Sequence, residues 1–122
     1  MTATPVSVTS TYYAAWKAKD FDTLRSVLAD DVDFAGPFGI AHSADEYRAK
    51  IEKVSEINTD IVVRKVFSDG ADVVTWFEHH TRVTDPVLVA TWSHVEDGKI
   101  TRQRAAFDPR RILAGLEGEG PS

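Results

Sequence analysis

The sequence has no cysteine and a single methionine among its 122 residues. Without cysteine, the chain cannot form disulfide bonds or thiolate metal sites. It also lacks a hydrophobic run of the roughly 18 residues that a membrane-spanning helix needs. Its first ten residues lack the basic and apolar blocks of a signal peptide. These absences predict a soluble, cytoplasmic protein that does not associate with a membrane.

Concentrated positive charge is also missing from the chain. The chain has 14 Lys and Arg residues and 19 Asp and Glu residues, which gives a net charge of −5. Nucleic acid binding depends on Lys and Arg that neutralise phosphates, so nucleic acid is not expected as a partner. Hydrophobic residues make up 43% of the chain, enough for the core of one globular domain. We expect that domain over residues 1–113, followed by a flexible, Gly-rich and acidic tail over residues 114–122.

Apolar spacing predicts helices in the first half of the chain. Apolar side chains recur at helical intervals within residues 8–16 and again within residues 21–29. Ser43 and Glu46 form a capping box, which would begin a third helix with Tyr47 on its inner face. These features predict three helices before the main sheet.

The residue pattern of the second half of the chain predicts β-strands. A short strand is expected near residues 32–34, between the second and third helices. Four longer strands follow, separated by turn signals such as Asp97-Gly98: residues 57–68, 72–83, 87–96 and 99–108. The predicted order is therefore α-α-β-α-β-β-β-β, an α+β domain.

Three stretches of the sequence together resemble the SnoaL-like branch of the nuclear transport factor 2-like superfamily. They are YYAAWKAKDFDTLRSVLADDVDF, GPFG and WSHVEDGKITRQRAAFDP, and the resemblance covers about residues 8–113. It implies a cone-shaped barrel in which a curved antiparallel sheet wraps around three helices and holds a hydrophobic pocket for a small apolar organic ligand. Relatives include ketosteroid isomerases, limonene epoxide hydrolases, polyketide cyclases and proteins without catalysis, so the fold does not decide the function.

The resemblance does not extend to the carboxylates of ketosteroid isomerases. Their general base is an Asp directly before a Pro, whereas this chain has Gly36 before Pro37. Their second oxyanion donor, also an Asp, falls near Thr91, and only their helical Tyr is matched, by Tyr12. Proton abstraction next to a carbonyl needs a positioned base, so the chain is not expected to be a ketosteroid isomerase.

The resemblance implies one acidic residue that could act in catalysis. Limonene epoxide hydrolases use an Arg and two Asp around one water; one Asp matches Asp108, whereas the Arg-x-Asp pair falls on His79-His80-Thr81. Polyketide cyclases place an acidic residue on the final strand, for which Asp108 is also the nearest candidate. One hypothesis therefore has Asp108 and His79 transferring protons, with Tyr12 donating a hydrogen bond to a substrate oxygen and no cofactor required.

Strand alternation assigns the remaining candidates to two faces of the sheet. With a two-residue turn at Asp97-Gly98, Thr91 would lie opposite Arg104, and Asp108 would share the pocket face. The expected ligand contacts are Trp16, Phe34, Phe38, Phe77, Thr81 and Thr91. The expected outer face holds an aromatic patch that the second subunit of a homodimer would cover: Trp76, Trp92, His94 and Phe107.

Each catalytic candidate also has a purely structural interpretation. Asp108 before Pro109 could cap a turn, and His79 could be an ordinary core histidine. His79 and His80 are strand neighbours that point to opposite faces, so a shared metal ion is not expected. Two functions stay open: a cofactor-independent cyclase, isomerase or hydrolase acting on a small apolar metabolite, and a non-catalytic ligand-binding or accessory domain.

Overall fold

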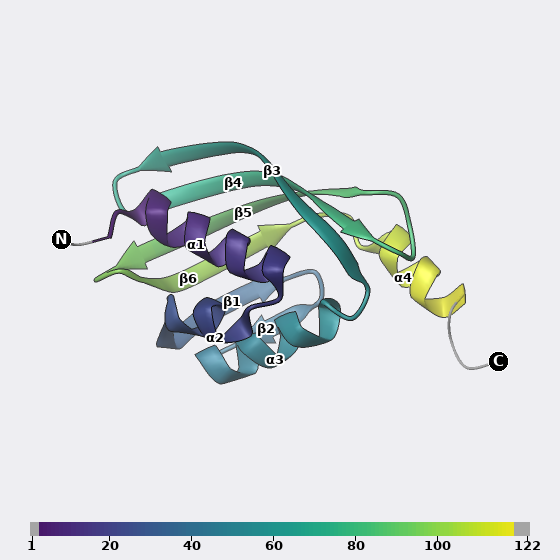
Figure 1. The fold of residues 1–122 in the computed structure, drawn as a ribbon, viewed down its shortest axis with the longest axis horizontal. Helices are drawn as coiled ribbons and strands as arrows, with labels where there is room; N and C mark the ends of the chain where they lie inside the picture. The colour runs from purple at the N-terminus through teal and green to yellow at the C-terminus, as the bar shows by residue number, and fades with distance from the viewer. Residues whose placement is uncertain (1–2, 119–122) are drawn as a thin grey trace.

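The computed structural model describes residues 3–118, which form four helices and one six-stranded sheet (Figure 1). The helices are α1 (Pro5–Ala18), α2 (Phe21–Ser26), α3 (Ala44–Val54) and α4 (Arg110–Gly118). The strands are β1 (Leu28–Gly36), β2 (Gly39–Ala41), β3 (Asn58–Asp69), β4 (Asp72–Thr81), β5 (Val87–Glu96) and β6 (Lys99–Ala106). The predicted α+β class with a curved sheet is confirmed.

The first three helices begin at side chains suited to capping. Thr4, Asp20 and Ser43 each accept a hydrogen bond from the backbone N–H three residues later, at 3.1, 3.2 and 3.1 Å. Such bonds satisfy N–H groups that have no partner within the helix. The second helix begins at residue 21 and the third directly after Ser43, as predicted.

The sheet has the order β2-β1-β6-β5-β4-β3 and differs from the expected antiparallel barrel. β1 begins at Leu28, ahead of the expected strand, and pairs with β6 in parallel. The backbone N–H of Ile100 donates to the carbonyl oxygen of Val27 at 2.8 Å, so the chain passes directly from α2 into the sheet. Leu28 and Val32 are both fully buried. The apolar spacing that suggested a longer second helix therefore belongs in part to this strand, and the sheet is open.

Helices α1, α2 and α3 cover the concave face of the sheet (Figure 1). Alternate side chains of β4 and β5 point into this layer, and the intervening ones point to the convex face. On β4, Phe77 and His79 are buried on the concave side. No helix within residues 3–118 is both long and apolar enough to cross a membrane.

Helix α4 occupies part of the segment that the sequence predicted to be a tail. The carboxylate of Asp108 accepts a hydrogen bond from the backbone N–H of Arg110 at 3.0 Å, at the start of the helix. Ile112 is 1% exposed and packs in a small cluster with Ile57 and Val87. Ile112 thus anchors the helix to the rest of the domain, and residues 114–118 continue it; residues 119–122 lie outside the described part of the chain.

Candidate ligand-binding site

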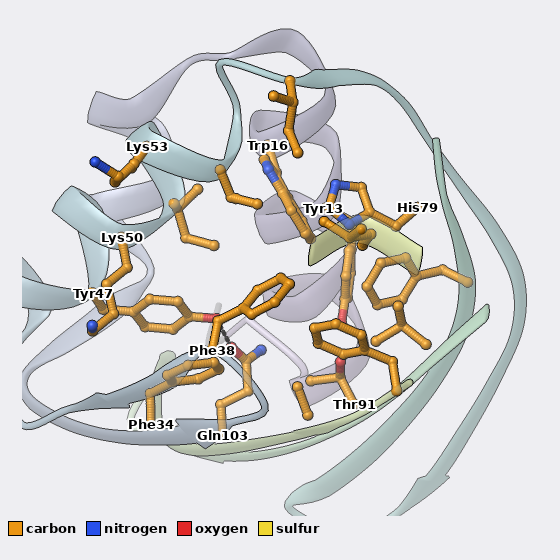
Figure 2. A pocket seen from close by; sticks show the side chains of 18 of the residues that line it. Tyr13, Trp16, Phe34, Phe38, Tyr47, Lys50, Lys53, His79, Thr91 and Gln103 are labelled. Atoms are coloured by element: carbon orange, nitrogen blue, oxygen red, sulfur yellow. Dashed lines mark hydrogen bonds between the residues drawn. The ribbon is translucent and has the colours of Figure 1, made fainter. Parts of the chain in front are cut away.

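A cavity of about 370 Å³ lies between the concave face of the sheet and helices α1, α3 and α4 (Figure 2). Its volume falls within the range of about 300–1,000 Å³ that is typical of small-molecule sites. Most of its wall is aromatic or aliphatic. Five of the six predicted ligand contacts line it: Trp16, Phe34, Phe38, Phe77 and Thr91.

The aromatic side chains of the wall pack against one another as well as facing the cavity. Phe34 stacks on Tyr47 with ring centroids 4.4 Å apart, and Trp16 lies edge-on to Phe77 at 5.8 Å. Contacts of this kind hold aromatic rings in one orientation. The cavity is therefore preformed by side chains that are fixed by their neighbours.

A chain of hydrogen bonds forms the polar part of the wall. The hydroxyl groups of Tyr12 and Tyr47 are 2.6 Å apart, and Tyr47 donates to Oε1 of Gln103 (Figure 2). Nε2 of Gln103 in turn donates to Oγ of Ser93 at 2.9 Å. All four side chains are buried, and burial raises the pKa of Tyr12 and of Tyr47 well above the usual tyrosine range. Both phenols therefore stay protonated at neutral pH.

The sequence did not identify Gln103 as part of the site, because a bulge changes the strand register. The predicted pairing holds at the turn, where Glu96 lies opposite Lys99. Beyond it the register shifts, so that Thr91 lies opposite Ala105. The predicted pairing of Thr91 with Arg104 is therefore wrong, and Gln103 points into the cavity wall in its place.

His79 is the second polar group of the cavity. Its side chain is 4% exposed and lies against Trp16, with ring centroids 5.2 Å apart. Nε2 is buried and has no hydrogen-bond partner in the described part of the chain. Burial lowers the pKa of His79 to about 4, so the imidazole is neutral at pH 7. His80 points to the other side of the sheet, where Nε2 lies 2.9 Å from the Glu78 carboxylate.

Asp108 does not line the cavity, and the structure does not bring it together with His79 there. Its carboxylate forms an ion pair with Arg110, Oδ2 to Nη2 at 2.7 Å, in which the Asp108 side chain is 56% exposed. These hydrogen bonds from Arg110 lower the pKa of Asp108 to about 2. β6 ends at Ala106, so the strand alternation used to place Asp108 does not apply to it.

Two further predicted positions differ from the expected ones. Phe107 was assigned to the outer face, but it lines the cavity and packs against Phe38 with ring centroids 5.1 Å apart. Thr81 is buried at the end of β4 without lining the cavity, and its hydroxyl oxygen accepts a bond from the backbone N–H of Val83 at 3.4 Å. Thr81 therefore supports the β4–β5 loop.

The mouth of the cavity is formed by α3 and α4. Lys50 and Lys53 of α3 contribute to the rim (Figure 2), and the half-exposed Leu113 and Leu116 of α4 also line the cavity. Gly115 sits between these leucines at the contact of α4 with the β4–β5 loop. A Cβ atom at this position would lie 2.4 Å from the carbonyl oxygen of Val83, so the helix can approach the loop this closely only with glycine there.

On the convex face, Trp76 and Trp92 are 39% and 37% exposed. The indole N–H of Trp92 donates to Asp72 at 2.8 Å, and Nδ1 of His94 lies 2.7 Å from the same carboxylate. Hydrogen bonds that His94 donates to the Asp72 and Glu96 carboxylates raise its pKa. Three of the four residues predicted for the outer face are therefore on it.

Comparison with protein families identifies the family to which the chain belongs. Residues 9–103 match the SnoaL-like domain family, a stretch that covers most of the 122 residues. The chain therefore belongs to the SnoaL-like domain family, as its three sequence stretches predicted. A comparison with curated proteins finds no match.

Solved structures support the same fold. A protein from Kribbella flavida DSM 17836 is 27% identical, with a TM-score of 0.86 over 92% of this chain and 93% of that chain. An NTF2-like protein from Cytophaga hutchinsonii is 24% identical, with a TM-score of 0.82 over 93% and 97%. An LEH-like epoxide hydrolase from M. tuberculosis is 21% identical, with a TM-score of 0.77 over 96% and 92%. At these identities the last two show a common fold and do not define an activity.

Proposed function

We propose that this protein binds a small, largely apolar organic molecule in the cavity. The observation that carries the proposal is the buried Nε2 of His79, which has no hydrogen-bond partner among residues 3–118 and belongs to a wall that is mostly aromatic or aliphatic. A buried polar atom without a partner costs about 1–3 kcal/mol. A ligand that bonds to this nitrogen would remove that cost while its apolar part fills the cavity.

The charges around the cavity favour binding over the proposed Asp108–His79 proton transfer. Among the described residues that line the cavity, Glu56 is the only one with a carboxylate, and it is exposed at the rim. Asp108 is held by Arg110 outside the cavity. Acid–base catalysis by an Asp–His pair needs both groups within reach of the substrate, and of these two only His79 lines the cavity.

Catalysis by His79 alone is the second candidate function. Its neutral imidazole, with Nε2 unpartnered, has a nitrogen available to accept or donate a proton at a bound substrate. This would suit a cofactor-independent isomerase, cyclase or hydrolase acting on a small apolar metabolite. Turnover of an identified ligand that is lost in His79→Gln, while binding is kept, would favour catalysis over binding alone.

Filling the cavity is expected to abolish binding of an apolar probe. Ala105 lines the cavity, whereas the neighbouring Ala106 is exposed on the other side of β6. N-phenyl-1-naphthylamine should fluoresce strongly with the wild-type protein and with Ala106→Phe. Ala105→Phe should weaken its binding by roughly tenfold or more, because the new ring occupies the site. Equal binding by the two variants would contradict a ligand site in this cavity.

We also propose a homodimer in which the convex sheet faces cover each other. Five large apolar side chains are exposed on that face, and gathered exposed apolar side chains often mark a protein–protein contact: Phe67, Val74, Trp76, Leu88 and Trp92. Sedimentation at micromolar concentration should give twice the chain mass of 13.5 kDa. Leu88→Lys should shift the protein to the monomer, and a wild-type mass near 13.5 kDa would exclude the dimer.

A further inference from the structure

Each buried hydroxyl group of the cavity wall has a single proton to donate. With the Gln103 amide oriented as in the structure, Oε1 is the acceptor and Tyr47 gives it its only proton. Nε2 of Gln103 is directed to Ser93, at 2.9 Å. The hydrogen bond between Tyr47 and Tyr12 must therefore run from Tyr12 to Tyr47, across 2.6 Å.

This direction determines what Tyr12 can offer a ligand. Its proton is committed to Tyr47, so the Tyr12 oxygen has only lone pairs left, and it lies in the wall of the cavity. To donate to a carbonyl oxygen, Tyr12 would have to break its bond with Tyr47 inside a buried network. The high pKa of both phenols means that neither gives up its proton to relieve this constraint.

We infer that the cavity selects a small, mostly apolar alcohol or phenol, whose hydroxyl group donates a hydrogen bond to the Tyr12 oxygen. The inference rests on the proposed binding function and names the class of its ligand. The His79 imidazole is neutral, so it offers one donor and one acceptor nitrogen and does not by itself favour either class. The hydroxyl groups of Tyr13 and Thr91 also line the cavity, and each can donate or accept. The discrimination between a hydroxyl group and a carbonyl group therefore depends on Tyr12, whose proton is already committed.

Three naphthalene derivatives of similar size test this inference. Binding of 2-naphthol, 2-methoxynaphthalene and 2-naphthaldehyde at pH 7 is measured by displacement of N-phenyl-1-naphthylamine. 2-Naphthol is expected to bind roughly tenfold more tightly than either analogue, the effect of about one hydrogen bond. Equal affinities, or tighter binding of the aldehyde, would overturn the inference. The second result would mean that the Gln103 amide is reversed and that Tyr12 is a donor.

Two conservative variants separate the direction of the network from simple packing. Tyr12→Phe removes the acceptor and should make the affinities for 2-naphthol and 2-methoxynaphthalene equal. Tyr47→Phe frees the Tyr12 proton and should shift the preference from 2-naphthol towards 2-naphthaldehyde. An unchanged preference for 2-naphthol in Tyr47→Phe would overturn the inference. If neither the fluorescent probe nor the three derivatives bind the wild-type protein, it is the proposed function that fails.

Discussion

His79→Leu is expected to flatten the dependence of stability on pH between about pH 6.5 and pH 4. In the folded protein, burial lowers the pKa of His79 from 6.5 to about 4. Above pH 6.5 the imidazole is neutral in both the folded and the unfolded chain, so it adds no pH dependence. As the pH falls below 6.5 the unfolded chain takes up the proton first, and stability is lost until the folded protein is protonated near pH 4. The total loss is about 3 kcal/mol.

The measurement is the free energy of unfolding in urea at several pH values, for the wild type and His79→Leu. Other groups titrate in both proteins, so the difference between the two curves isolates His79. Leucine also removes the unpartnered Nε2, and the variant is expected to be at least as stable as the wild type at pH 7. Parallel curves from pH 7 to pH 4 would mean that His79 is open to water, and would remove its role as the buried polar contact.

The apolar wall of the cavity could be predicted from the sequence because regular elements determine it. Tyr12 and Trp16 are four residues apart on one helix and therefore share a face. Phe77 and His79 are two residues apart on a strand, and both point inward as the alternation requires. The helix and strand periods alone were enough to place these side chains.

The polar part of the site depends on irregularities that have no clear sequence signal. One extra residue between the Val95–Ile100 and His94–Arg102 pairs moves Gln103 to the inner face. Asp108 lies just beyond the strand, where its carboxylate forms an ion pair with Arg110, two residues further along the chain. The family resemblance suggested a catalytic role for Asp108, and its local contacts give it a structural one.

The last segment of the chain was also difficult to predict, because its composition was the main guide to its structure. The glycines of the last segment suggested loose chain from residue 114, yet α4 continues to Gly118. Gly115 is where the helix meets the β4–β5 loop, so its missing side chain permits packing. Glycine therefore marks a close contact here, and composition alone could not distinguish that from a flexible tail.

Gly115→Ala is expected to displace α4 and to open the mouth of the cavity. The added Cβ would lie 2.4 Å from the carbonyl oxygen and 2.8 Å from Cβ of Val83, too close to both backbone and side chain. Overpacking of this kind costs about 1–3 kcal/mol. Moving α4 would withdraw Leu113 and Leu116 from the cavity wall. The affinity for N-phenyl-1-naphthylamine should fall by roughly fivefold to tenfold, and trypsin should cut sooner after Arg110 and Arg111.

Gly118→Ala is the matched control, because a Cβ at that position meets no atom of residues 3–118 within 4 Å. Alanine favours a helix interior by about 1 kcal/mol over glycine, which applies to Gly115 and not to Gly118 at the last position of α4. Propensity alone would therefore make Gly115→Ala at least as favourable as the control, and only the contact with Val83 can make it less so. Weaker probe binding in Gly115→Ala but not in Gly118→Ala would identify α4 as the closure of the cavity. If Gly115→Ala binds the probe as tightly as the control, α4 covers the mouth without contributing to ligand binding.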